Sequence, residues 1–135
     1  MSGLWLKMIG PTQEACPEPY ERSYVDFSRR PARVHSGDHM ILYAVGRQNR
    51  VFAIAEVKSE VYQASGNPDE NGRWPYRVDI EYLEKMPASK GVHINEVSTP
   101  HRDLLRSLRQ QSYISLSREE YERAATRLQE AASAQ

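Results

Sequence analysis

Two apolar runs joined by a short polar connector constrain the fold of this chain more than any other feature. Residues 40–45 and 51–58 are apolar at nearly every position, and the five residues 46–50 join them. A connector of this length is typical of a β-hairpin. Strands that are apolar on both faces occupy central positions in a sheet that is covered on two sides. Gly37 and Asp38, directly before the first run, predict a tight turn.

Strand patterns recur along the rest of the chain. Residues 74–83 alternate between apolar and charged side chains and are the clearest half-exposed strand. Residues 12–34 carry three prolines, so we expect a loop there with at most short helical turns. The remaining predicted strands are 4–9, 113–116 and, with a weaker pattern, 92–97.

Two segments carry the pattern of a helix start. Thr99 is an N-cap residue followed by proline at the first helical position, and Ser117 with Glu120 forms a capping box for the last helix. The 135 residues suffice for one domain and are too few for two. We therefore expect a single α+β domain over all 135 residues, with a core at about 4–125 and a frayed tail at 129–135. Its sheet should form a mixed β pseudo-barrel of about five to six strands, flanked by helices.

Charge and composition exclude several classes of protein. Lys and Arg number 18, Asp and Glu number 18, and the net charge is zero. This excludes a chain that coats nucleic acid or anionic lipid through a general positive charge, although it allows a local basic patch. Cys16 is the single cysteine, which excludes an intrachain disulfide and fits a reducing compartment. With no signal-peptide pattern and no membrane-spanning apolar run, we expect a cytoplasmic protein with no membrane partner.

The sequence contains no complete catalytic or metal-binding pattern. No Walker loop, dinucleotide glycine fingerprint, nucleophile elbow or HExxH occurs. His35, Asp38 and His39 lie within five residues, but Gly37 prevents a regular helix there and no second Cys/His pair completes a site. Cys16 has no obvious base beside it. We therefore expect no metal, no cofactor and no enzymatic activity.

Basic and aromatic residues favour nucleic acid as the partner. Arginines cluster in the segment before Gly37 and on the predicted helix that begins near residue 100. Such side chains bind phosphates without reading sequence, and a plain solvated surface is the alternative explanation. Aromatic rings stack on unpaired bases, although tyrosines on strands are also common in a core. The residues predicted to contact phosphate are Arg29, Arg30, Arg33, Arg106 and Arg109.

Several stretches, taken in order, resemble a known family. They are LWLKMIGP at 4–11, RRPARVHSGDHMILY at 29–43, VFAIAEV at 51–57, WPYRVDIEYLEK at 74–85 and QQSYISLSREEYERA at 110–124. Together they make the chain similar to the EVE domain, a member of the PUA-like superfamily that is related to the YTH and ASCH domains. The resemblance implies a PUA-like pseudo-barrel with a pocket that accepts a modified or flipped base.

The resemblance also implies which residues form this base pocket. They are Lys7, Ile9, Gly10, Ser23, Tyr24, Tyr43, Trp74 and Ser112. Residues 21–25 depart from the Trp-Gly-Val or Val-Arg-Asn step of many family members. This departure leaves open which side chain makes the base-reading hydrogen bond and whether Tyr24 replaces a tryptophan.

We therefore expect a non-enzymatic nucleic-acid reader, with a monomer favoured, that binds a modified or flipped base of DNA or RNA. Trp74 and Tyr24 would stack on the base, while serines and backbone groups near Gly10 would hydrogen-bond its edge. Two alternatives remain. One is a small ASCH-like amidohydrolase that acts on modified nucleosides through Lys7, Thr12 and Glu14, and the other is a protein-interaction module with a vestigial pocket.

Overall fold

A computed structural model gives the fold of the chain. It describes residues 3–9, 22–27, 29–44, 49–63, 76–98, 104, 106 and 113–134. Within these residues, no helix is both long enough and apolar enough to cross a membrane.

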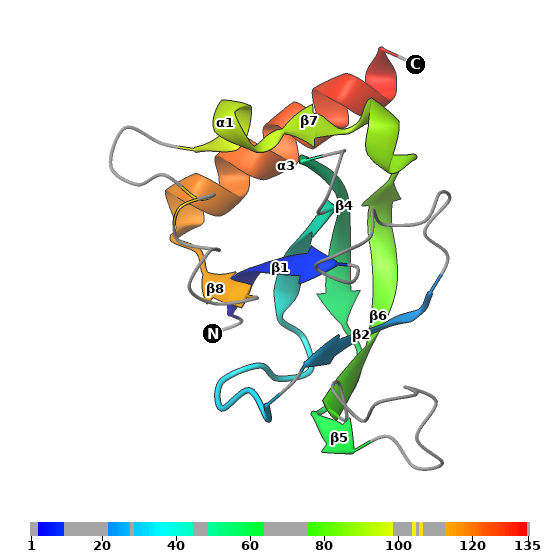
Figure 1. Cartoon of the computed structure of the whole chain (residues 1–135), viewed down its shortest axis with the longest axis vertical. Coiled ribbons are helices and arrows are strands. Elements are labelled where there is room, and N and C mark those ends of the chain that lie inside the picture. The colour runs from blue at the N-terminus through cyan, green and yellow to red at the C-terminus, as the bar shows by residue number, and fades with distance from the viewer. Residues whose placement is uncertain are drawn as a thin grey trace.

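The strands form one mixed sheet (Figure 1). Its main path is β2-β6-β4-β3-β1-β8, in which β1 and β3 are parallel and the other neighbours are antiparallel. Two short strands lie off this path, where β5 pairs with β6 and β7 pairs with β4. The strands are β1 (Leu4–Ile9), β2 (Tyr24–Phe27), β3 (His39–Ala44), β4 (Arg50–Val57), β5 (Tyr62–Gln63), β6 (Tyr76–Lys85), β7 (Val92–His93) and β8 (Tyr113–Ser115).

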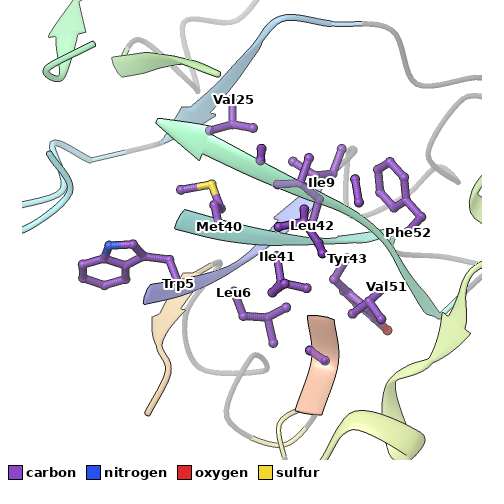
Figure 2. Packing of buried hydrophobic residues seen from close by; sticks show 14 of the residues in the cluster. Trp5, Leu6, Ile9, Val25, Met40, Ile41, Leu42, Tyr43, Val51 and Phe52 are labelled. Atoms are coloured by element: carbon purple, nitrogen blue, oxygen red, sulfur yellow. The ribbon is translucent and has the colours of Figure 1, made fainter. Parts of the chain in front are cut away.

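The two apolar runs form the centre of the sheet, as the sequence predicts. Every residue of β3 after His39 is buried, and in β4 only Arg50 and Glu56 are not fully buried. Both strands have neighbours on each side, and their side chains are covered on both faces. Figure 2 shows Met40 and Leu42 on one side of the sheet, and Ile41 and Tyr43 on the other.

The sheet curls until its two ends meet. β2 and β8 are the first and last strands of the main path, yet the rings of Phe27 and Tyr113 pack edge to face, with centroids 5.1 Å apart. Lys7 of β1 points into the same interior, with its Nζ 5.2 Å from the centroid of the Phe27 ring. The fold is therefore an α+β fold built on a curled mixed sheet, which confirms the predicted fold class of a mixed β pseudo-barrel flanked by helices.

Helix α3 (Arg118–Ser133) covers the outer face of the curled sheet, and Figure 1 shows it lying across the central strands. The predicted capping box is present, because the Ser117 side chain accepts from the Glu120 backbone and the Glu120 side chain accepts from the Ser117 backbone. Ala124 and Leu128 are buried against the sheet, at 1% and 0% exposure. Tyr121 reaches β3, where its hydroxyl lies 2.8 Å from Nδ1 of His39.

Three predictions about local structure differ from what is observed. Residues 12–34 include strand β2, because Val25 and Phe27 are each 1% exposed and the strand pairs with the first half of β6. Residues 92–97 form only the two-residue strand β7 and then helix α1 (Ile94–Val97), which follows the short 3₁₀ helix η1 (Ala88–Lys90). The last helix continues to Ser133, through much of the tail that the sequence predicts to fray.

Candidate functional site

The predicted turn at Gly37 and Asp38 is present directly before β3, and it is hydrogen-bonded to the end of β4. Gly37 adopts a φ of 94°, which is costly for residues with a side chain. Its N–H donates to the carbonyl oxygen of Val57 at 2.7 Å, and Val57 N–H donates back to the carbonyl of Asp38 at 2.8 Å. The turn therefore extends the β3–β4 pairing beyond the start of β3.

The Asp38 carboxylate binds three N–H groups from separate parts of the chain. Its Oδ1 accepts from the Gly3 backbone at 2.7 Å, while its Oδ2 accepts from the Trp5 indole and the His35 backbone, both at 2.9 Å. The residue is only 3% exposed. A side chain on Gly3 would collide with this arrangement, because a Cβ there would lie 2.7 Å from the Trp5 indole nitrogen. Asp38 thus joins the start of β1 to the turn before β3 and fixes the indole.

Beside this carboxylate lies a pocket of about 600 Å³, which we call the β1–β8 pocket. It is lined by the start of β1, by β8, and by side chains from the segment 32–38. Trp5 and Tyr113 provide two aromatic rings, with centroids 5.8 Å apart and planes at 55°. Arg33 and His35, which are exposed, also line it. The pocket therefore combines an aromatic wall with basic groups, and its volume lies in the range of small-molecule sites.

Behind the aromatic wall lies a buried amine. Lys7 is 2% exposed, and its Nζ donates to the carbonyl oxygen of Met8 at 2.7 Å. Burial lowers the pKa of Lys7 to about 8, against a smaller opposing effect of the Asp26 carboxylate. Tyr113 contacts Phe27, and Phe27 lies under Lys7, so the three side chains form one layer inside the barrel.

A carboxylate holds the imidazole at the edge of the pocket. Glu60 follows β4; its Oε1 lies 2.9 Å from Nδ1 of His35, and its Oε2 accepts from the Ser36 backbone at 2.7 Å. The hydrogen bond to Glu60 raises the pKa of His35, and the bond to His35 lowers the pKa of Glu60. Both side chains are well exposed, so water reaches the pair.

The residues predicted to form the base pocket do not all lie together. Lys7 and Ile9 are buried in the barrel. Tyr43 lies on the opposite face of the sheet, because it pairs with Met8 and not with Lys7, and successive strand residues point to opposite sides. Its hydroxyl donates to Oδ1 of Asn49 at 2.8 Å, and burial raises its pKa. Tyr43 is therefore a core residue covered by the helical side of the fold.

Ser23 and Tyr24 lie on a third surface. Val25 and Phe27 point into the barrel, so Tyr24 points away from it. Its ring contacts two guanidinium groups, with the Cζ atoms of Arg77 and Arg22 at 4.0 Å and 5.7 Å from the ring centroid. Ser23 is exposed, and its carbonyl accepts from Ile80 N–H at 2.8 Å. The other three predicted pocket residues, Gly10, Trp74 and Ser112, lie outside the described residues.

The predicted phosphate contacts fall into two groups. Arg29, Arg30 and Arg33 are all exposed on the segment between β2 and β3, where Arg33 lines the β1–β8 pocket and Arg30 lies 5.2 Å over the Tyr76 ring. Arg106 is exposed and helical, whereas Arg109 lies outside the described residues. The first group therefore places a cation directly at an aromatic pocket.

Most residues that line the β1–β8 pocket were not predicted as site residues, among them Trp5, His35, Asp38 and Tyr113. Strand alternation puts Trp5 on the same face as Lys7, and that pattern is visible in the sequence. The approach of Tyr113 and Asp38 to Trp5 depends on the pairing of β1 with β8 and with β3, which no local pattern reveals. His35 and His39 turn to separate partners, Glu60 and Tyr121. Within the described part of the chain, no three His, Cys, Asp or Glu side chains gather as a metal site would require.

Comparison with solved structures places the fold among known ones. A hypothetical protein from Leishmania major superposes with a TM-score of 0.66 at 15% identity, covering 99% of this chain and 97% of that one. The NMR structure of a Rhodopseudomonas palustris protein gives a TM-score of 0.61 at 17% identity, with 92% and 91% covered. The crystal structure of ASCH from Zymomonas mobilis gives 0.56 at 11% identity, with 92% and 94% covered. These similarities establish the fold alone.

A comparison with curated proteins finds no match to this chain. The family comparison does find one, because the model of the EVE domain matches residues 26–126. That range begins within β2 and ends within α3, so it includes the central strands, the Asp38 turn and β8. The chain therefore belongs to the EVE domain family.

Proposed function

We propose that this EVE domain is a nucleic-acid-binding module without enzymatic activity, and that it holds one base, modified or flipped out, in the β1–β8 pocket. The observation that carries the proposal is the pocket itself, in which Trp5 and Tyr113 lie beside the exposed Arg33. Aromatic rings and guanidinium groups are the two elements that proteins combine to bind unpaired bases and their phosphates.

The geometry of the two rings suggests how a base would be held. Their planes are inclined by 55°, so a flat base packs against one ring and meets the edge of the other, unlike a sandwich between parallel rings. Tyr113 is half-buried and offers more of its ring than Trp5, which is 7% exposed. Stacking on such a ring contributes about 1–3 kcal/mol per base.

The arginines supply affinity that does not depend on sequence. Arg29, Arg30 and Arg33 lie on one exposed segment whose end lines the pocket. Phosphate contacts of this kind weaken as salt rises, because each neutralised phosphate releases condensed counterions. Unpaired strands or single nucleotides are the favoured ligands, since flipping a base from a duplex costs a few kcal/mol.

Binding to a panel of plain and modified single-stranded oligonucleotides, measured by fluorescence anisotropy at low salt, tests the proposal. Tyr113→Ala should weaken binding about 5- to 150-fold, the equivalent of about 1–3 kcal/mol of lost stacking. The matched control is Tyr62→Ala, because Tyr62 is an exposed tyrosine on β5 that does not line the pocket. Arg33→Ala adds an exposed variant whose folding is not at risk, and it should reduce both the affinity and its salt dependence.

Two outcomes would overturn the proposal. The first is that no oligonucleotide of the panel binds at low salt. The second is that Tyr113→Ala and Arg33→Ala both bind like the unaltered protein, with circular dichroism confirming that both variants are folded.

The amidohydrolase alternative draws on one observation, the lowered pKa of the Lys7 amine. A buried amine whose pKa is lowered toward neutral pH is the kind of group that nucleophilic and acid–base chemistry use. However, Lys7 is 2% exposed, and its Nζ lies over the Phe27 ring and donates to the Met8 carbonyl, so no path to a substrate is evident among the described residues. Incubation of the pure protein with acylated cytidines should release no carboxylic acid. If the protein did release the acid, and the Lys7→Met variant did not, the hydrolase would be favoured.

A further inference from the structure

We propose that His35 and Arg33 form an anion-binding lip on the β1–β8 pocket, which takes the phosphate of the bound nucleotide and engages it most strongly when His35 is an imidazolium. This inference rests on the proposed function for the identity of the ligand, and it adds His35 as a residue that responds to charge and pH.

The backbone places both side chains at the mouth of the same pocket. Arg33 and His35 line it and are exposed, whereas Val34 between them is 1% exposed and buried in the core. Val34 therefore anchors the segment, and its two neighbours are left at the surface. No ion pair to Arg33 occurs within the described part of the chain, so its guanidinium is available for an anion.

Glu60 fixes the imidazole in one orientation. Its two oxygens bind two successive residues, Nδ1 of His35 at 2.9 Å and the backbone N–H of Ser36 at 2.7 Å. With Nδ1 occupied by Glu60, the remaining ring nitrogen, Nε2, has no hydrogen-bond partner in the described part of the chain. A second ring nitrogen that carries a proton is the donor that a phosphate oxygen accepts from.

The nearby charges favour the imidazolium form of His35. Two carboxylates act on the ring: Glu60 through its hydrogen bond and charge, and Asp38 through its charge; partial desolvation opposes them. Their combined effect raises the pKa of His35. Both carboxylates are already hydrogen-bonded, Asp38 to three N–H groups and Glu60 to His35 and Ser36, and Arg33 contributes a further positive charge at the pocket. The phosphate contact is therefore present below the raised pKa and is lost as pH rises through it.

A phosphate at this lip comes either from the phosphodiester backbone of a strand or from the monoester of a free nucleotide. The chemistry is the same, and separate probes distinguish the sources. A phosphodiester keeps one negative charge over the whole working range of pH, whereas a monoester titrates near pH 6 and would confuse the profile. The phosphodiester is therefore the better probe of the imidazole.

The first experiment follows the His35 ring by NMR as pH is varied, in sodium sulfate and in sodium chloride of equal ionic strength. Sulfate stands in for a phosphate group. If the anion prefers the imidazolium, linkage requires that it raise the pKa of His35, by about one unit for a tenfold preference. Arg33→Gln should reduce the rise, and the ring of His93, which does not line the pocket, should not respond. An unchanged His35 pKa would overturn the anion-binding lip.

The second experiment measures affinity for a single-stranded oligothymidylate, for the same sequence with an uncharged methylphosphonate backbone, and for thymidine monophosphate. The phosphodiester strand should bind about fivefold more weakly at pH 8.0 than at pH 5.5, while His35→Gln shows no such change. Glu60→Gln should move the midpoint of the profile to lower pH. Equal pH profiles for the unaltered protein and His35→Gln would overturn the role of His35.

The two experiments also separate this inference from the proposed function. A sulfate response without any nucleic-acid binding retains the lip and removes the proposed function. Oligonucleotide binding that is independent of pH and of His35 would support the proposed function and remove the anion-binding lip. Preference for thymidine monophosphate over the strand assigns the phosphate to a free nucleotide, and preference for the strand assigns it to the backbone.

Discussion

Removal of the Asp38 carboxylate tests the most consequential interaction in the fold. Asp38→Ala leaves three N–H groups without their acceptor: Gly3, His35 and the Trp5 indole. The indole bond is buried, so its loss costs about 1–3 kcal/mol, since water cannot replace the acceptor. The two backbone donors are partly buried and regain some hydration, at about 0.5–1 kcal/mol each. We expect a loss of about 3 kcal/mol in the free energy of unfolding.

Urea unfolding followed by far-UV circular dichroism measures this loss, and a second probe locates it. In a Trp74→Phe background, the fluorescence of Trp5 alone reports whether the indole has loosened. Asp38→Asn keeps the shape and one acceptor oxygen, so it should lie between Asp38→Ala and the unaltered protein. Asp79→Ala is the matched control: its exposed carboxylate accepts one hydrogen bond from Tyr62, and its loss should cost no more than about 0.5 kcal/mol.

The reasoning would be refuted if Asp38→Ala were no less stable than Asp79→Ala. It would also be refuted if Asp38→Ala were destabilised but left the Trp5 fluorescence unchanged. In that second case the carboxylate would stabilise the turn alone, and the indole would owe its position to packing against Tyr113.

Two further predictions concern stability. Burial lowers the pKa of Lys7 from 10.5 to about 8, so the unfolded state binds more protons between these values and the free energy of unfolding should rise with pH there, by up to about 3 kcal/mol. Urea midpoints at several pH values should show this rise relative to Lys7→Met, and parallel profiles would contradict it. A Cβ at Gly91 would collide with the backbone oxygen of Val51, so Gly91→Ala should cost about 2 kcal/mol in the same assay, while exposed Lys90→Ala stays near the unaltered protein. Equal stability of these two variants would show that β7 can shift at no cost.

The central hairpin could be predicted because its information is local. Both strands are apolar at nearly every position and are joined by a short polar connector, a combination that favours a hairpin whose strands are covered on two faces. The start of α3 could be predicted equally well, since a capping box is contained in four consecutive residues. Strand β2 was not, because its four residues follow a proline-rich stretch and owe their conformation to pairing with β6, some fifty residues later.

The site shows the same division between local and non-local information. Alternation along β1 correctly gives Lys7 and Ile9 a common face, but which residues of β3 share that face depends on the register. In the observed register Lys7 lies beside Leu42, which sends Tyr43 to the other side of the sheet. A shift of one residue would have reversed this assignment, so the base pocket implied by the resemblance could not be checked before the pairing was known.

The Asp38 turn depends on both local sequence and long-range contacts. Its glycine and aspartate predict a turn, yet the carboxylate does more than close it, because it binds the start of β1 and the wall of the pocket. Glu60 binds the His35 ring and the Ser36 backbone, while Asp38 binds the His35 backbone, so two carboxylates fix the same short stretch of chain. A pocket mouth held in this way loses little conformational entropy when a ligand binds. The smaller entropy cost makes binding tighter. Variants of Asp38 should therefore weaken ligand binding through Trp5 and His35 together, even though the carboxylate itself has no free oxygen to offer a ligand.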